Sequence, residues 1–359
     1  SRESKSTYET YLPLIAQSQS KVITPNWLSQ KGAQKGLSET QQNTIKDYWV
    51  NAGRTNLSNM LGYVAMDVLN KPKAANIEVA APIIFPEKGL YHPEYNNLIA
   101  KDLETFWNWR KPEANQPKIA LLFTRSSIET ESTALVDETI TALENRGAAV
   151  LPFFFKLARG EQSYDELLYL PGKPEPEVEV DLIINFRNIH WANQRKVEFE
   201  KFGVPVIQAM TYYSGDQKAW EDDVQGVDMG MMAFTLVLPE GAGVTDPLIV
   251  AASDRSQSSI EIIDYQHKHL VNKAMNLAAL KYKPNQDKKV TLFVWGDQDV
   301  GASFLNVPES ISAIGNQLNS EGYQIPSQNA DFITDRVKRI LNPFYRDYQL
   351  DELLKEDLA

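Results

Sequence analysis

Short apolar runs that alternate with amphipathic helices, from Lys118 onward, restrict the fold of this chain more than any other feature. Lys118–Phe123 (KIALLF) has the length and composition of a buried strand, and Ser132–Asn145 has the spacing of an amphipathic helix that ends at Gly147. The pattern then continues with a helix over Gln194–Phe202 and with strands over Ala149–Phe155, Val180–Phe186, Val204–Gln208 and Met232–Leu238. Strands that alternate with helices are typical of a parallel sheet. We therefore expect an α/β fold of mostly parallel sheets flanked by helices, in flavodoxin-like or periplasmic-binding-protein-like units.

The regions before and after this core divide the chain into three predicted parts. Residues 1–112 are predicted to form a helical N-terminal segment and a proline-rich connector. Residues 113–285 form the α/β domain, which closes with a long helix over Ser259–Tyr282. Residues 286–359 begin a second α/β domain that we expect to be incomplete, with a strand over Lys289–Trp295, a helix over Pro308–Asn319 and a short strand over Tyr323–Ile325.

Composition excludes several classes of function. The 359 residues contain no cysteine, which rules out thiolate metal sites, thiol nucleophiles, iron–sulfur clusters and disulfides. The 36 basic and 47 acidic residues give a net charge of −11, so no nucleic-acid footprint is expected. No apolar run approaches the roughly 18–20 residues of a membrane-spanning helix, and we predict a cytoplasmic protein. Four scattered histidines predict no tightly bound transition metal, and no phosphate-binding P-loop is present.

Polar and aromatic residues follow the predicted strands at the points where each strand ends. Ligands of open α/β sheets bind outside the carboxyl ends of the strands, so these positions are the candidate ligand-binding site. Arginines could bind carboxylates, and tyrosines and tryptophan could stack on a flat ring. Ordinary loop structure is the alternative for each position. The candidate residues are Arg125, Ser126, Arg187, His190, Tyr212, Tyr213 and Trp295.

Several blocks of the sequence, in order, resemble a known family. Gly89-Leu90-Tyr91-His92-Pro93 looks like the connector found in the large subunits of cobaltochelatase (CobN) and of magnesium chelatase. The other blocks that resemble this family are Gly53 with Asn56-Leu57, Lys118–Ser126 followed by Thr133–Gly147, Val206–Trp220, Phe234–Glu240, and Phe304–Ser310 leading to Gly322-Tyr323. Together they cover most of residues 45–326.

The resemblance implies a part of the tetrapyrrole-binding subunit of an ATP-dependent metal chelatase, which inserts cobalt or magnesium into a corrinoid or porphyrin. It also implies that ATP and Mg²⁺ bind to separate AAA+ partner subunits, in line with the missing P-loop, and that this chain holds no cofactor. Members of the family are far longer, so we expect an N-terminal or central fragment that is not catalytic alone.

Other functions remain open at this stage. One is a stand-alone module whose two α/β units close on a small molecule. A second is a CobN-like protein that handles haem or another metallated ring. A third is a structural arm that docks AAA+ partners. The sequence does not distinguish the ring, the metal, or insertion from removal.

Overall fold

The computed structural model describes most of the chain, and two compact units can be recognised in it, Ser1–Ala278 and Ala279–Ala359. The described residues are 13–14, 16–17, 19–23, 34–71, 78–156, 163–170, 178–254, 259–293, 301–302, 305–326 and 328–340.

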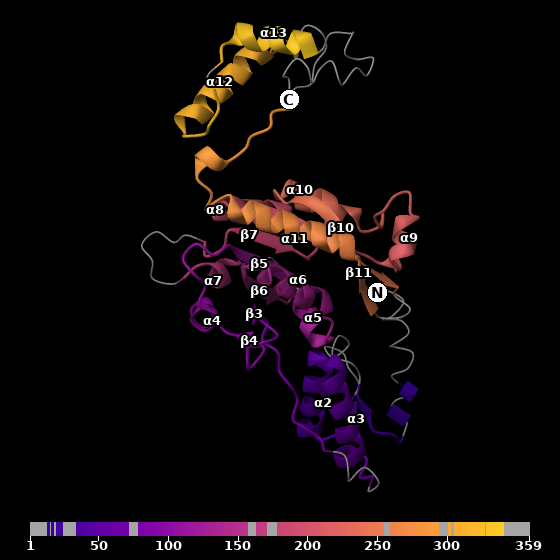
Figure 1. The fold of residues 1–359 in the computed structure, drawn as a ribbon. Helices are drawn as coiled ribbons and strands as arrows, with labels where there is room; N and C mark the ends of the chain where they lie inside the picture. Colours follow the sequence, from indigo (N-terminus) through magenta and orange to yellow (C-terminus); the bar gives the residue numbers. More distant parts are fainter. Residues whose placement is uncertain are drawn as a thin grey trace. The chain divides into compact units, whose positions relative to one another are not determined.

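A nine-stranded mixed sheet is the centre of the first unit, in the order β11-β10-β8-β7-β5-β6-β3-β4, with β9 paired to β10 (Figure 1). Its five central strands are parallel to one another, and β11, β9, β3 and β4 are antiparallel additions at the edges. The strands are β3 (Lys88–Tyr91), β4 (Ile99–Ala100), β5 (Lys118–Thr124), β6 (Ala149–Phe155), β7 (Leu182–Asn185), β8 (Val206–Tyr212), β9 (Ser214–Gly215), β10 (Thr245–Asp254) and β11 (Ser259–Ile262).

The order of the parallel strands has a direct consequence for ligand binding. The parallel strands can be numbered 1 to 5 in chain order, as β5, β6, β7, β8 and β10. Across the sheet they lie in the order 2-1-3-4-5, which is the flavodoxin-like order. The α/β fold predicted from sequence is confirmed. The direction of winding reverses between β5 and β7, and the carboxyl ends of these two strands therefore mark the switch point where such folds bind ligands.

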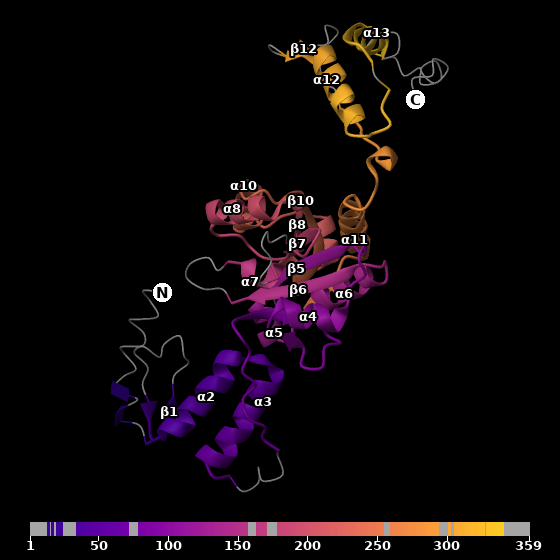
Figure 2. The ribbon, with the colours of Figure 1, turned by 90° about the vertical axis from the view of Figure 1, so that its left-hand side faces the viewer.

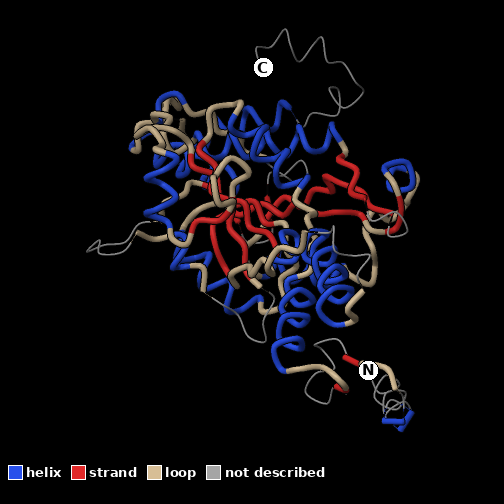
Figure 3. Tube along the Cα trace, turned by 90° about the horizontal axis from the view of Figure 1, so that it is seen from below, coloured by secondary structure: helices blue, strands red, loops and turns tan. Residues whose placement is uncertain are grey.

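Helices cover both faces of the sheet (Figures 2 and 3). One layer contains α6 and α11, whose apolar side chains pack in one buried cluster with the strands; the other contains α4, α7 and α8, which share a second cluster. The helices of the first unit include α4 (Leu103–Arg110), α5 (Arg125–Glu129), α6 (Ala134–Glu144), α7 (Asp165–Leu168), α8 (Ala192–Phe202), α9 (Gln217–Glu221), α10 (Leu238–Gly241) and α11 (Asp264–Ala279).

A helix pair precedes the sheet. Helices α2 (Glu39–Asn51) and α3 (Gly53–Tyr63) lie against each other, and α3 continues into a π-helical turn, η2 (Val64–Val68). The start of α2 is a capping box, in which Ser38 and Gln41 exchange side-chain and backbone hydrogen bonds. Before this pair, β1 (Val22–Ile23) and β2 (Gln34–Lys35) form a short antiparallel pair. Residues 88–100, which the sequence placed with the N-terminal segment, supply β3 and β4 to the main sheet.

One predicted element of the first unit is wrong, and another begins later than predicted. Met232–Leu238 is not a strand: it forms a π-helical turn, η4 (Ala233–Val237), that leads into α10. Pro239 is tolerated at the start of that helix, and a short apolar run cannot be distinguished from a helix by its periodicity. The fifth parallel strand is β10, whose apolar residues Leu248–Ala252 were the missed signal. The predicted helix over Ser259–Tyr282 begins only at Asp264, because Ser259–Ile262 pairs with β10.

In the second unit, the described residues form the helices α12 (Val307–Ser320) and α13 (Ala330–Ile340), the 3₁₀ turn η5 (Asn285–Asp287), and a strand pair, β12 (Gly301–Ala302) with β13 (Leu305–Asn306). Helix α12 confirms the predicted helix over Pro308–Asn319. The predicted strands do not form in residues 289–293 or 323–325, where no neighbouring described strand offers backbone partners. Residues 294–295, which end the predicted strand over Lys289–Trp295, lie outside the described residues.

Candidate ligand site at the carboxyl edge of the sheet

Six of the seven candidate residues lie at one edge of the sheet. The register pairs Leu122 of β5 with Asn185 of β7, and Asn185 with Gln208 of β8, so the three strands point to the same edge, and β8 continues beyond the end of β7 to Tyr212. Arg125 and Ser126 follow β5, Arg187 and His190 follow β7, and Tyr212 and Tyr213 are at the end of β8. The seventh residue, Trp295, lies outside the described residues. Although they share an edge, the six side chains have different surroundings.

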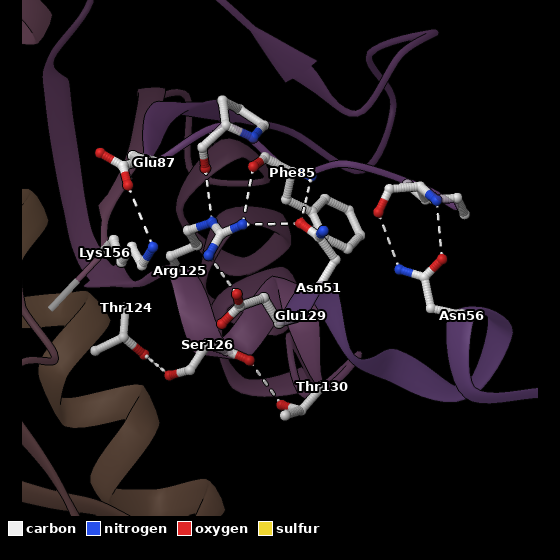
Figure 4. A network of polar contacts seen from close by, with 12 residues as sticks. Asn51, Asn56, Phe85, Glu87, Thr124, Arg125, Ser126, Glu129, Thr130 and Lys156 are labelled. Carbon is white, nitrogen blue, oxygen red and sulfur yellow. Dashed lines mark hydrogen bonds and ion pairs between the residues drawn. The ribbon is translucent and has the colours of Figure 1, made fainter. Parts of the chain in front are cut away.

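The Arg125 side chain is buried and binds groups of the protein itself (Figure 4). Its Nε donates to the carbonyl of Pro86 at 2.8 Å, and Nη2 donates to the carbonyl of Phe85 at 2.8 Å and to Oδ1 of Asn51 at 3.0 Å. Nη1 forms an ion pair with Glu129 one turn later on α5. All three nitrogens of the guanidinium are engaged, so a ligand carboxylate could reach Arg125 only by displacing these partners.

Asparagine side chains of the helix pair bind the connector that enters this network. Asn56 donates from Nδ2 to the carbonyl of Ile83 at 2.9 Å and accepts from its N–H at 2.8 Å. Asn51 accepts from the N–H of Phe85 at 3.0 Å, and Tyr48 donates to the carbonyl of Ala80 at 2.5 Å. These bonds satisfy backbone groups of a segment that has no strand partner.

Gly53 and Glu131 join the helix pair to α5. Gly53 has a φ of +80°, and a Cβ at this position would lie 2.6 Å from the carbonyl oxygen of Glu129. The backbone N–H of Thr55, in the first turn of α3, donates to Oε1 of Glu131 at 3.2 Å. A carboxylate at a helix N-terminus is favourable for both the free N–H groups and the helix dipole. The helix pair is therefore attached beside the carboxyl end of β5.

Arg187 is also buried, in a second polar network beneath the edge. Its N–H donates to Oδ1 of Asn185 at 3.2 Å, and its carbonyl accepts from the side-chain amides of Asn185 at 2.9 Å and Gln208 at 3.3 Å. Asn185 also donates to Oε1 of Gln208 at 2.6 Å. The guanidinium donates to the hydroxyl of Tyr164 at 3.3 Å. This network fixes the loop after β7.

Next to Tyr164, charged side chains border a cavity of about 300 Å³ on the α7–α8 face. The Arg195 guanidinium lies 3.6 Å from the ring centroid of Tyr164 and forms an ion pair with Glu198. Burial raises the pKa of Glu198 above its usual value, although the positive charge of Arg195 opposes this shift. Lys201 pairs with Asp165 at 2.7 Å. The cations and carboxylates that border this cavity thus pair with one another.

His190 differs from the arginines because its side chain is exposed. Its ring centroid is 4.6 Å from that of Phe234 and 5.8 Å from that of Trp191. The N–H of Ile189 donates to the carbonyl of Phe234 at 3.1 Å, which ties the π-helical turn η4 to this loop. Trp191 itself is 38% exposed. The result is an accessible imidazole between two aromatic rings.

The remaining candidates are one serine and two tyrosines. Ser126 is exposed, and its hydroxyl is 2.8 Å from that of Thr124, at the end of β5. Tyr212 is buried and donates to Asp223 at 2.9 Å, whereas Tyr213 is 45% exposed. Of the six residues, Ser126, His190 and Tyr213 therefore have side chains that face solvent.

The Gly-Leu-Tyr-His-Pro connector has a structural role in and just after β3, which pairs with β6 on the outer side of the sheet. A Cβ on Gly89 would lie 2.8 Å from a methyl group of Ile99, and Leu90 is fully buried. The hydroxyl of Tyr91 donates to Asp137 of α6 at 2.9 Å, and burial raises its pKa to about 12.

His92, the next residue of that connector, is buried against Glu144. Its Nδ1 accepts from the N–H of Glu94 at 3.2 Å, so Nε2 carries the proton that it donates to Glu144 at 3.2 Å. Arg110 lies 2.5 Å from the same carboxylate. Burial alone would raise the pKa of Glu144, but the hydrogen bond from His92 and the positive charge and hydrogen bond of Arg110 lower it below its usual value.

Sequence reasoning missed Phe234 and Trp191 as parts of this edge. Phe234 was assigned to a strand, and its contact with His190 depends on the fold of η4. Trp191 directly follows His190 in the sequence, and this aromatic residue next to a candidate was the signal that could have identified it. Among the described residues, no group of three or more His, Asp or Glu side chains could hold a metal ion, and no helix is long and apolar enough to cross a membrane.

The fold and motifs of this chain match one family of proteins. A family model described as CobN/Magnesium Chelatase matches residues 46–346, which include the whole central sheet, α3 and the second half of α2. The chain belongs to the CobN/magnesium chelatase family.

Relatives of known name agree with this assignment. Magnesium-chelatase subunit ChlH of Oryza sativa is 25% identical over 299 residues, which are 77% of this chain and 21% of that protein. Aerobic cobaltochelatase subunit CobN of Pseudomonas aeruginosa is 25% identical over 284 residues, 75% of this chain and 22% of that protein. The catalytic subunit of cobaltochelatase from Mycobacterium tuberculosis has the same fold, with a TM-score of 0.59 and 16% identity over 80% of this chain and 23% of that one. The chain spans about a fifth to a quarter of the length of these proteins.

Proposed function

We propose that this chain is part of the large, tetrapyrrole-binding subunit of a metal chelatase that inserts cobalt or magnesium into a corrinoid or porphyrin. The observation that carries the proposal is the family match over residues 46–346, because it covers the sheet and its complete carboxyl edge. The relatives are named for magnesium and cobalt chelation. Ser126, His190 and Tyr213 are the exposed candidate contacts for the ring at that edge.

The division of labour within the complex is part of the same proposal. The sequence has no P-loop, so we propose that ATP and Mg²⁺ bind to separate AAA+ subunits and that this chain holds no cofactor of its own. Arg125 and Arg187 contribute indirectly, because each holds a loop at the carboxyl edge. We place the complex in the cytoplasm.

A titration of the chain with a free-base porphyrin and with a corrinoid, followed by absorbance, tests ring binding. A saturable change in the spectrum of either ring supports the proposal. An unrelated protein of similar size and net charge that has no ring-binding site is the control for non-specific uptake of the ring. If neither spectrum changes by more than it does with this control protein, the proposal is wrong for this part of the protein.

A further inference from the structure

We propose that His190 is an axial ligand for a metal ion held at the centre of a flat ring, so that this edge binds the metallated ring more tightly than the free ring. The inference rests on the proposed function and adds the form of the ring that the site prefers.

The surroundings of His190 suit ligation. The side chain is exposed, and no hydrogen bond or ion pair joins its imidazole to another described residue. A neutral imidazole nitrogen without a proton is the commonest protein ligand for a metal ion. The ring centroids of Phe234 and Trp191 lie 4.6 and 5.8 Å from that of the His190 imidazole. These aromatic contacts restrict the orientation of the imidazole without engaging its nitrogens.

The position in the fold also favours this role. His190 follows β7, one of the two strands at the switch point of the sheet. The backbone of its loop is fixed by the Asn185–Gln208–Arg187 network and by the bond from Ile189 to Phe234. The exposed indole of Trp191 offers apolar surface to a macrocycle beside the metal.

The metal is expected to arrive in its ring rather than as a free ion. A single imidazole is a weak site for a free cation, and the described residues contain no cluster of metal-binding side chains around it. A metal inside a macrocycle already has four ring nitrogens and needs only an axial ligand, as in haem proteins. One accessible histidine is sufficient for that coordination.

Zinc protoporphyrin and free-base protoporphyrin form a matched pair of probes, since they share the macrocycle and its carboxylates and differ in the metal. We expect the wild-type chain to bind the zinc form at least about tenfold more tightly and to shift its main absorbance band as an axial imidazole does. In His190→Ala the zinc form should lose this advantage and the band shift, while the affinity for the free base stays the same. Added imidazole should restore the band shift.

His269→Ala is the control variant, because His269 is an exposed histidine on α11 in the other helix layer. It should behave as the wild type does. Equal affinity of the wild type for the two rings, or an unchanged preference in His190→Ala, would overturn the axial-ligand role while leaving the proposed function intact. Failure of the wild type to bind either ring would overturn both.

Discussion

Buried polar side chains, rather than exposed ones, account for most of the distinctive residues at the carboxyl edge. The side chains of Arg125, Asn185 and Asn56 each bind backbone groups of a loop or connector, and each does so with more than one hydrogen bond. A buried polar group that loses its partner costs about 1–3 kcal/mol. These residues therefore contribute to stability in ways that their position in the sequence does not reveal.

Asn56→Ala should lower the free energy of unfolding by about 1–3 kcal/mol, because it leaves both the N–H and the carbonyl of Ile83 without their partner. Urea unfolding measures the change. Ser58→Ala, at an exposed position of the same helix, is the control and should change stability by less than about 0.5 kcal/mol. Equal effects of the two substitutions would show that the Asn56 bonds contribute nothing measurable.

His267 predicts a dependence of stability on pH. The Thr139 hydroxyl donates to the carbonyl of Leu135 at 2.6 Å, so it accepts a hydrogen bond from Nε2–H of the buried His267 at 2.9 Å. Burial lowers the pKa of His267 below its usual value of 6.5, although Glu138 and Asp264 partly oppose the shift. The unfolded chain thus binds more protons than the folded chain just below pH 6.5, and stability should fall as the pH is lowered through that value.

Replacement of His267 by Gln should make the urea midpoint less dependent on pH between about 7 and 5. The exposed His269→Gln should leave the wild-type dependence in place. If the wild type and His267→Gln lose stability in parallel on acidification, His267 is not the group responsible.

At the scale of elements, the close approach between the backbone of Gly53, at the start of α3, and that of Glu129, at the end of α5, determines how the helix pair is attached to the first unit. Gly53 and Gly147 both have positive φ, +80° and +88°, so alanine is strained at each by roughly 1–2 kcal/mol. Their surroundings differ: a Cβ on Gly53 would overlap the carbonyl of Glu129, whereas nothing lies within 4 Å of a Cβ on Gly147.

Gly53→Ala should therefore destabilise the protein more than Gly147→Ala does, and hydrogen exchange should accelerate in α2 and α3. Chemical denaturation and exchange of the two variants give the comparison, in which Gly147→Ala measures the backbone strain alone. If Gly53→Ala lowers the free energy of unfolding no more than Gly147→Ala does, the contact between the helix pair and α5 can accommodate the added Cβ without a loss of stability.

Sequence reasoning succeeded for elements whose own residues carry the signal. The run at Lys118–Phe123 is buried throughout its apolar part, and the helix after it ends near Gly147 as predicted. It failed at Met232–Leu238, where an apolar run of strand length forms η4 and α10 over the loop after β7. It also missed Phe234 at the site, since only the tertiary fold brings that ring to His190.

At the scale of the whole molecule, the first unit has a complete interior of its own. The buried clusters that hold the sheet between its helix layers consist of residues between Leu90 and Ala278. A protein of residues 34–288 should accordingly unfold in one cooperative transition, with a urea midpoint close to that of the main transition in the full chain. Circular dichroism during the titration measures it. A gradual, non-cooperative loss of signal would show that this unit needs the rest of the chain.

The sequence by itself determined the α/β class, the parallel strand ends and the edge where ligand contacts should gather, because strand and helix periods and strand direction are properties of local segments. The tertiary structure alone decided what each side chain at that edge does. Arg125 and Arg187 are enclosed by segments up to about 75 positions away, whereas His190 remains open to solvent. Burial and hydrogen-bond partners depend on contacts between residues distant in sequence, and those contacts exist only in the folded chain.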